Sequence, residues 1–332
     1  MNKTGEPQLR PRGPKPGLIG GNALEFRKNM VAFYQRNQRE FGDVAFYRLL
    51  NLPFYQLSHP ADIKEVLLTQ AHKVQKSPIY KQMLSKYLGN GLLISDGEVW
   101  KRQRKRTQPS FHHVRIHAYA DTMVESTAQA IADWQERGAV DIYDEMTRLT
   151  LQIVVQTLFH VDVREQATEI GELTRVLQEA VIGEVSTPLR LPDWVPTPAL
   201  RRKRHSIQRL DEIVYGIIND RLQTGEDRGD LLSMMLLTED DNGNRMTPQE
   251  ARDEALTIFI AGHDTTANAL TWTWVLLSQH PAVGAKLDAE LDRVLGDRLP
   301  TLEDLPALTY SSLNAGRFAI ALCKLQDNAP LL

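Results

Sequence analysis

Apolar residues recur every three to four positions over most of the sequence, which is the spacing of one face of an α-helix. The pattern predicts an early helix over 24–41 that ends at Gly42, and another that starts at His59-Pro60 and runs to Thr69. From residue 97 onward nearly the whole chain follows this spacing. The helices expected there span 97–108, 114–137, 141–160, 164–183, 199–223, 228–238, 247–280 and 282–295.

The β signal is confined to one short stretch. Residues 43–50 and 52–58 are rich in aromatic and aliphatic side chains and look like short strands joined tightly around Asn51, which predicts a hairpin. Residues 71–96 are expected to form a long loop, the four prolines of 186–198 another, and 238–246 a turn. No repeat or low-complexity linker divides the chain, so the expected fold class is mainly α with a small β part.

The longest predicted helix begins at a strong start signal. Thr247 can accept a hydrogen bond from the N–H of Glu250, Glu250 can reach back to Thr247, and Pro248 suits the first helical position. The next proline is Pro281, so the helix can run for about 33 residues, or roughly 50 Å. A helix of that length would cross a whole domain.

The middle of this helix, AGHDTT at 261–266, holds residues that are unfavourable in a buried helix. Gly262 costs about 1 kcal/mol relative to alanine, and Asp264 is costly if buried without a partner. Thr265 and Thr266 can bond to carbonyls one turn earlier and bend the helix. We interpret the stretch as a ligand site, at which the regular packing of the helix is interrupted. A flat molecule would approach the backbone at Gly262, the Thr265 hydroxyl would reach that molecule, and Asp264 would face a water channel.

A second candidate site lies upstream, where Trp100 and Arg104 are four residues apart and therefore share one helix face. An indole N–H and a guanidinium together suit a carboxylate. The other basic residues of 101–106 are expected to form a solvated face, or a surface that receives an acidic electron-donor protein. The basic run at 201–205 is expected to be exposed charge.

These motifs resemble those of the cytochrome P-450 family. Residues 261–266 are similar to the family's central-helix motif, and Trp100 to Arg104 to its W-x-x-x-R helix, placed before P-x-F and about 160 residues ahead of the first motif. Looser matches are PRGPKPGLIGGNALEF at 11–26, the hairpin at 43–58, and segments 280–296 and 302–313. The resemblance covers residues from about 11 to 313.

The resemblance implies a haem-thiolate monooxygenase that inserts one atom of O2 into a small apolar organic substrate, with electrons from a ferredoxin- or flavodoxin-type donor. It implies that Asp264 and Thr265 deliver protons. The other implied contacts are Trp100 and Arg104 on a haem propionate, Ala261, Gly262 and Thr265 beside the haem and dioxygen, and Phe259 and Ile260, with loops 77–95 and 184–198, on the substrate. The family leaves the position of His263 free, so we assign that residue no role.

Composition limits location and partners. The 332 residues carry a net charge of −3, which argues against a nucleic-acid partner. The one cysteine, Cys323, excludes a disulfide framework and favours a reducing compartment. The first 17 residues are polar and proline-rich, and no run approaches 20 apolar residues. We therefore expect a cytoplasmic protein without a membrane span.

The family pattern is not followed after Leu313. The family next has Glu-x-x-Arg and a cysteine loop of the form F-x-x-G-x-R-x-C-x-G, but no Glu follows Glu303, and Cys323 lies in AIALCKLQ. We therefore expect a partial domain at 1–313 and an unrelated tail at 314–332, as in a truncated or frameshifted gene product. Such a product is expected to be poorly soluble. It is also expected to contain no metal ligand, so that its retention of haem is doubtful.

Two other functions are compatible with the sequence. A non-catalytic remnant, acting as a helical interaction protein, would bind no stoichiometric haem and show no turnover. A metal-dependent hydrolase could use the His263-Asp264 dipeptide, and it would bind a transition metal without haem.

Overall fold

The computed structural model describes residues 10–18, 20–111, 113–159, 167–186, 195, 197–239 and 243–312. The chain divides into two compact units, with the boundary in the sequence between Gln75 and Lys76, and each is described by itself. The expected boundary at 313/314 lies at the edge of the described residues, and it stays a prediction. None of the described helices is both long enough and apolar enough to cross a bilayer.

The first unit contains the predicted hairpin. Strands β1 (Val44–Leu49) and β2 (Leu52–Leu57) pair antiparallel, with Val44 opposite Leu57. The expected helix over 24–41 is divided into α1 (Ala23–Lys28) and α2 (Met30–Phe41), because the side chain of Asn29 caps α2 by accepting from the N–H of Ala32 at 2.9 Å. Further along lie α3 (Pro60–Lys64), a π-helical turn at Glu65–Thr69 and a 3-10 turn at Ala71–Lys73.

The second unit confirms the mainly helical prediction. Its elements are α4 (Pro78–Leu88), α5 (Gly97–Thr107), a 3-10 turn (Gln108–Phe111), α6 (His113–Arg137), α7 (Ile142–Phe159), α8 (Ala167–Ser186), α9 (Pro198–Thr224), α10 (Leu231–Leu237), α11 (Pro248–Gln279), α12 (Pro281–Leu295) and a 3-10 turn (Leu302–Asp304).

The prediction of a loop over 71–96 was wrong, because this segment contains α4. The helix buries one face through Met83, Leu84, Tyr87 and Leu88, a one-turn repeat that the interspersed Lys, Gln and Ser residues conceal in the sequence.

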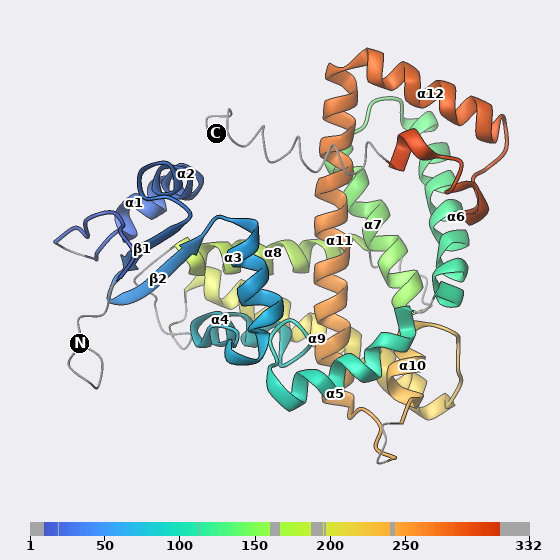
Figure 1. The fold of residues 1–332 in the computed structure, drawn as a ribbon. Coiled ribbons are helices and arrows are strands. Elements are labelled where there is room, and N and C mark those ends of the chain that lie inside the picture. Colours follow the sequence, from blue (N-terminus) through green and yellow to red (C-terminus); the bar gives the residue numbers. More distant parts are fainter. Residues whose placement is uncertain are drawn as a thin grey trace. The chain divides into compact units, whose positions relative to one another are not determined.

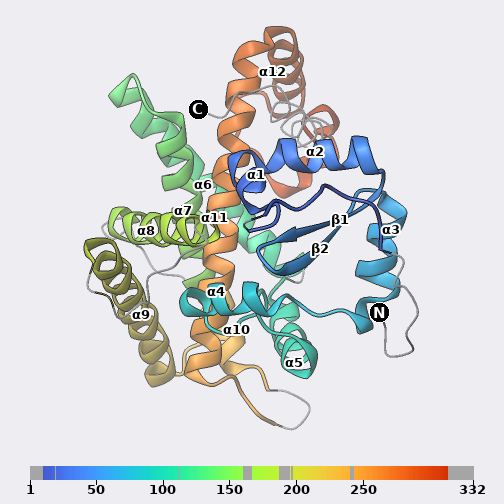
Figure 2. The same cartoon turned by 90° about the vertical axis from the view of Figure 1, so that its left-hand side faces the viewer.

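Helix α11 is the axis of the second unit (Figures 1 and 2). The predicted capping box is present: Thr247 Oγ1 accepts from the N–H of Glu250 at 3.2 Å, and Glu250 accepts from the N–H of Thr247 at 3.0 Å. Helix α7 packs along α11, and α8 and α9 pack against each other. Leu151, Ile218 and Leu256 from α7, α9 and α11 belong to one buried apolar cluster.

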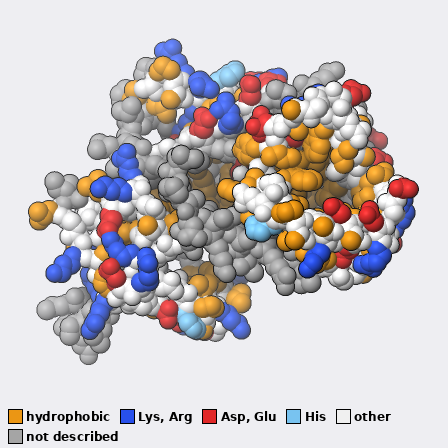
Figure 3. Space-filling model, turned by 90° about the horizontal axis from the view of Figure 1, so that it is seen from above, with side chains coloured by type: hydrophobic (Ala, Val, Ile, Leu, Met, Phe, Trp, Pro, Cys, Tyr) orange, Lys and Arg blue, Asp and Glu red, His pale blue; other side chains and the backbone are white. Residues whose placement is uncertain are grey.

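The surroundings of α11 change along its length. Residues 251–257 are all buried, so the first half lies inside the core. From the middle onward one face is exposed, with Ala261, Thr265, Asn268 and Trp272 following at helical spacing. Seen from above, hydrophobic side chains gather over the end of the second unit where α12 lies (Figure 3).

Loop 89–96 is fastened to the buried half of α11. The N–H of Asn90 donates to Asp253 at 2.7 Å, and the N–H of Leu92 donates to Glu254 at 3.0 Å. Gly91 permits this close approach, since a Cβ there would lie 2.4 Å from Thr257 Oγ1. The loop leads directly into α5, so these contacts place α5 relative to α11.

Candidate functional site

The middle of α11 presents two different faces to its surroundings. Ala261 and Thr265 lie one turn apart on the exposed face. The predicted back-bonds are present, with Thr265 Oγ1 donating to the carbonyl of Ala261 and Thr266 Oγ1 to that of Gly262, both at 2.7 Å. A Cβ at Gly262 would lie 3.5 Å from the Val154 side chain, so this glycine faces α7 and its packing there would tolerate alanine.

Asp264 lies at a pocket of about 200 Å³ between α7, α8 and α11, and most of the residues that line it have polar side chains. His263 also lines this pocket. The remaining lining residues are Tyr143, Asp144, Thr147, Arg148, Leu151, Gly171, Glu172, Arg175 and Gln178. The acid of the motif therefore lies beside a space that water can enter, while Thr265 lies on the exposed face.

His263 is buried against its own helix. Its Nδ1 lies 3.2 Å from the carbonyl oxygen of Phe259, and the two rings stack with centroids 5.2 Å apart. Burial lowers the pKa of this imidazole, with the Phe259 carbonyl and the Asp264 carboxylate acting in the opposite direction. Within the described residues, no group of three His, Cys, Asp or Glu side chains is placed to hold a metal ion.

The two residues expected to contact substrate belong to the core in this structure. Phe259 is 3% exposed and lies in the main apolar cluster, and Ile260 packs against that cluster from a half-buried position. Phe259 also lines a small apolar cavity with Leu210 of α9. Substrate contact by these residues stays a prediction.

Trp100 and Arg104 share one face of α5, as their spacing predicts. The Arg104 guanidinium carbon lies 5.3 Å from the centroid of the Trp100 ring, a cation–π contact. In the described part of the chain, neither the indole N–H nor the guanidinium has a hydrogen-bond or ion-pair partner. By contrast, Lys101 pairs with Glu98 and Arg102 with Glu250. Both donors are therefore available to an external anion.

Sequence reasoning missed a buried ion pair in the basic run at 201–205. Lys203 is 5% exposed, and its Nζ donates to Glu184 of α8 at 2.7 Å. The hydroxyl of Tyr87 in α4 donates to the same carboxylate oxygen at 2.7 Å. The expectation of exposed charge was wrong for Lys203, because its partners come from two other helices.

A family model for cytochrome P-450 matches residues 11–313. Cyclooctatin synthase of Streptomyces melanosporofaciens is 35% identical over 88% of this chain and 64% of its own length. Cyclooctat-9-en-7-ol 5-monooxygenase of the same organism is 32% identical, over 93% and 68%. The crystal structure of the cytochrome P450DA heme domain superposes with a TM-score of 0.79 and 26% identity, covering 90% of this chain and 67% of that one.

The match confirms the extent of the resemblance seen in the sequence, from 11 to 313. The chain spans less than two thirds of the length of cyclooctatin synthase and about two thirds of the other two proteins. Cys323 and the expected tail at 314–332 lie outside the described residues.

Proposed function

This chain belongs to the cytochrome P-450 family, whose cofactor is haem, and we propose that it supplies the oxygen-activating face of a monooxygenase. The observation that carries the proposal is that α11 has two different faces. Ala261 and Thr265 lie on its exposed face, and Asp264 lies on a second face that borders the pocket between α7, α8 and α11. Such a helix can contact a flat cofactor on one side and exchange protons with water on the other.

The residues present fit a haem in two places. The exposed face at Ala261 and Thr265 carries small side chains, so a flat macrocycle can lie against the helix. On α5, Trp100 and Arg104 are two donors without a partner in the described residues, which suits a propionate. None of these residues carries a thiol, so we assign no iron ligand among them. When bound, haem would supply the dioxygen chemistry that side chains cannot perform.

The side chains would control protons and access. Thr265 would hold its hydroxyl on the cofactor side of α11, and Asp264 would exchange protons with pocket water. Ala261, on the exposed face, would leave room beside the cofactor, whereas the missing side chain of Gly262 faces Val154 of α7. The back-bond from Thr265 to Ala261 turns the hydroxyl proton toward the helix, so the oxygen lone pairs face outward and can accept a hydrogen bond.

The substrate we propose is a small, mainly hydrocarbon molecule, with Phe259 and Ile260 among its contacts. Two relatives are named for such compounds, cyclooctat-9-en-7-ol and, in Streptomyces avermitilis, pentalenene. We further propose an acidic ferredoxin- or flavodoxin-type donor that docks on the exposed cations of α5, Lys101, Arg102 and Lys105. Arg106, which was expected on the same solvated face, is buried and donates to the carbonyl of Asn244 at 3.0 Å. A cytoplasmic location is consistent with such a soluble donor.

Arg104→Ala is expected to weaken haem binding by about 1.5–3 kcal/mol, because a hydrogen bond to a charged group would be lost. The measurement is a titration of the purified chain with haem, followed by absorbance. Lys101→Ala is the matched control, since Lys101 is an exposed cation of the same helix paired with Glu98. Equal affinities for all three proteins would contradict the propionate assignment. Absence of stoichiometric haem binding in the wild type would favour a non-catalytic interaction protein.

Thr265→Ala is expected to lower the yield of product per O2 consumed by about tenfold, less than the 10²–10⁴-fold of a group acting directly as an acid. Thr266→Ala is the control, because it removes an identical back-bond from the adjacent exposed threonine. The assay supplies heavy-isotope dioxygen and a pentalenene-type hydrocarbon, and it counts labelled oxygen in the product. A similar loss in both variants would show that the effect comes from the helix and not from the Thr265 hydroxyl.

A further inference from the structure

The polar pocket beside Asp264 contains a group that the proposed function does not use. His263 is 2% exposed, yet it is one of the residues lining the pocket. Its Nδ1 lies 3.2 Å from the Phe259 carbonyl oxygen, which can only accept a hydrogen bond. The proton of the neutral ring is therefore on Nδ1, and Nε2 carries a lone pair.

That lone pair is available to the pocket. Among the described residues, Nε2 has no hydrogen-bond partner, and His263 is one of the residues that line the pocket. A pocket of about 200 Å³ has room for several waters, and polar side chains of α7, α8 and α11 are among its lining residues, so water can satisfy a buried acceptor there. His263 and Asp264 are thus two titratable groups of one helix beside the same water.

We propose that His263 is a proton-carrying residue of this pocket, serving Asp264. A proton that enters from bulk water binds Nε2 and forms the imidazolium. Pocket water then carries that proton to the Asp264 carboxylate, and the ring returns to its neutral form. The step moves one proton and no electrons. It rests on the proposed function, in which Asp264 supplies protons to the oxygen-activating face.

The charges around the pocket favour transient protonation. Three carboxylates face it, one from each helix: Asp144, Glu172 and Asp264. The two cations that face the pocket already form ion pairs, Arg148 with Glu145 at 3.4 Å and Arg175 with Glu179 at 2.5 Å. Besides these groups and His263, the titratable group at the pocket is the phenol of Tyr143. Burial keeps the pKa of His263 below its usual value, so the ring is neutral at pH 7 and releases a captured proton readily.

A purely structural role for His263 would come from its stacking on Phe259. Two substitutions separate the roles. His263→Phe keeps an aromatic ring and removes both nitrogens. His263→Gln keeps a polar amide near the position of Nε2, but that amide cannot take up a proton between pH 5 and 8.

The first test needs no haem. NMR of the histidine-labelled chain identifies the His263 signals as those absent from His263→Phe. We expect the Nδ1–H tautomer, a titration midpoint below 6.5, and a further fall of about half a pH unit or more in Asp264→Asn, because a nearby negative charge would be removed. An Nε2–H tautomer, or a midpoint that Asp264→Asn does not move, would overturn the proposal.

The second test uses the haem-loaded protein. Both His263 variants are expected to lower the yield of product per O2 by roughly threefold to tenfold, below the range for direct acid–base groups. They should also lose the step in the pH profile at the wild-type midpoint. Wild-type yield in His263→Gln would show that hydrogen bonding alone suffices, and the proton-carrying role would be rejected. Failure to bind haem would count against the proposed function, while the NMR result would still decide the assignment of His263.

Discussion

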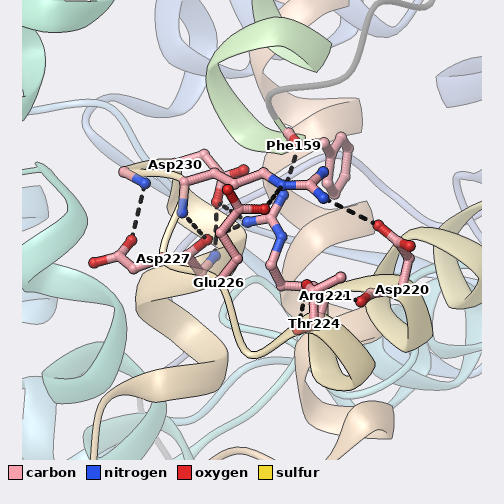
Figure 4. A network of polar contacts seen from close by, with 10 residues as sticks. Phe159, Asp220, Arg221, Thr224, Glu226, Asp227 and Asp230 are labelled. Carbon is pink, nitrogen blue, oxygen red and sulfur yellow. Dashed lines mark hydrogen bonds and ion pairs between the residues drawn. The ribbon is translucent and has the colours of Figure 1, made fainter.

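Arg221→Met is expected to destabilise the second unit by about 3–5 kcal/mol, the usual cost of removing one partner from a buried ion pair. Arg221 and Asp230 are each 1% exposed, and the guanidinium donates to Asp230 Oδ1 at 2.7 Å (Figure 4). It also donates to Ser233 Oγ and, at 3.0 Å, to the carbonyl of Phe159. One side chain therefore joins the ends of α7 and α9 to the start of α10.

The substitution would leave a carboxylate that cannot move to water. Asp230 caps α10 by accepting from the N–H of Ser233 at 2.7 Å, so its position is fixed by the helix. Methionine has a similar length to arginine and limits the cavity, which makes the unpaired charge the main cause of the loss. Urea unfolding followed by circular dichroism measures the change in the free energy of unfolding.

Arg228→Met is the matched control. Arg228 pairs with Glu226 at 2.9 Å and with Asp220 at 3.3 Å in the same region (Figure 4), but both partners are exposed. Its loss should cost less than about 1 kcal/mol. The double variant Arg221→Met with Asp230→Asn should recover part of the stability, because no buried charge remains unpaired. A cost below that of Arg228→Met would show that the buried pair is not what holds the three helices together.

The helices and the site motif could be predicted because their signals are local. The capping box at Thr247 and the back-bonds of Thr265 and Thr266 depend only on residues one turn away, and the structure contains them. Trp100 and Arg104 share a face for the same reason. Helix α4 was missed because its apolar face is short and interrupted by polar residues.

The buried charges could not be predicted, because their partners are distant in sequence. Lys203 is one of five consecutive basic residues at 201–205, and its neighbours in the sequence do not distinguish it from the exposed residues of that run. Its burial depends on Glu184 and Tyr87, which other helices bring to it. His263 illustrates the same limit, since the family leaves its position free and only the packing of α7 and α8 places it at a pocket.

Ionisation of Glu254 is expected to make the protein less stable as pH rises from about 4.5 to about 7. This carboxyl is fully buried on α11, and burial raises its pKa to about 7. The Leu92 N–H acts in the opposite direction, as does the Lys76 ammonium, while Asp253 and Glu250 add to the rise. The other oxygen, Oε1, has no partner in the described part of the chain.

The direction of this change in stability with pH follows from the number of protons bound by the folded and unfolded states. The unfolded chain releases this proton near pH 4.5, whereas the folded protein retains it up to about pH 7. In that interval the folded state binds more protons, so the free energy of unfolding falls with rising pH and levels off above pH 7. The difference in pKa corresponds to about 3 kcal/mol. Glu254→Gln removes the titration, so relative to wild type it should gain that amount between pH 4.5 and pH 8.

Glu250, one turn earlier on α11, is a control with the opposite sign. Although burial opposes the shift, the Thr247 N–H and Arg102 hold the pKa of its carboxyl below the usual value. Its contribution to stability is present above the pKa of the unfolded chain and is lost as pH falls, so Glu250→Gln should be most destabilising near neutral pH.

Urea unfolding of the wild type and the two variants at several pH values tests both signs. Parallel pH profiles for wild type and Glu254→Gln would show that this carboxyl is already ionised in the folded protein. The attachment of loop 89–96 to α11 would then involve a buried charge. Lys76, which donates to the carbonyls of Leu92 and Ser95 in that loop, is a cation that stabilises this charge.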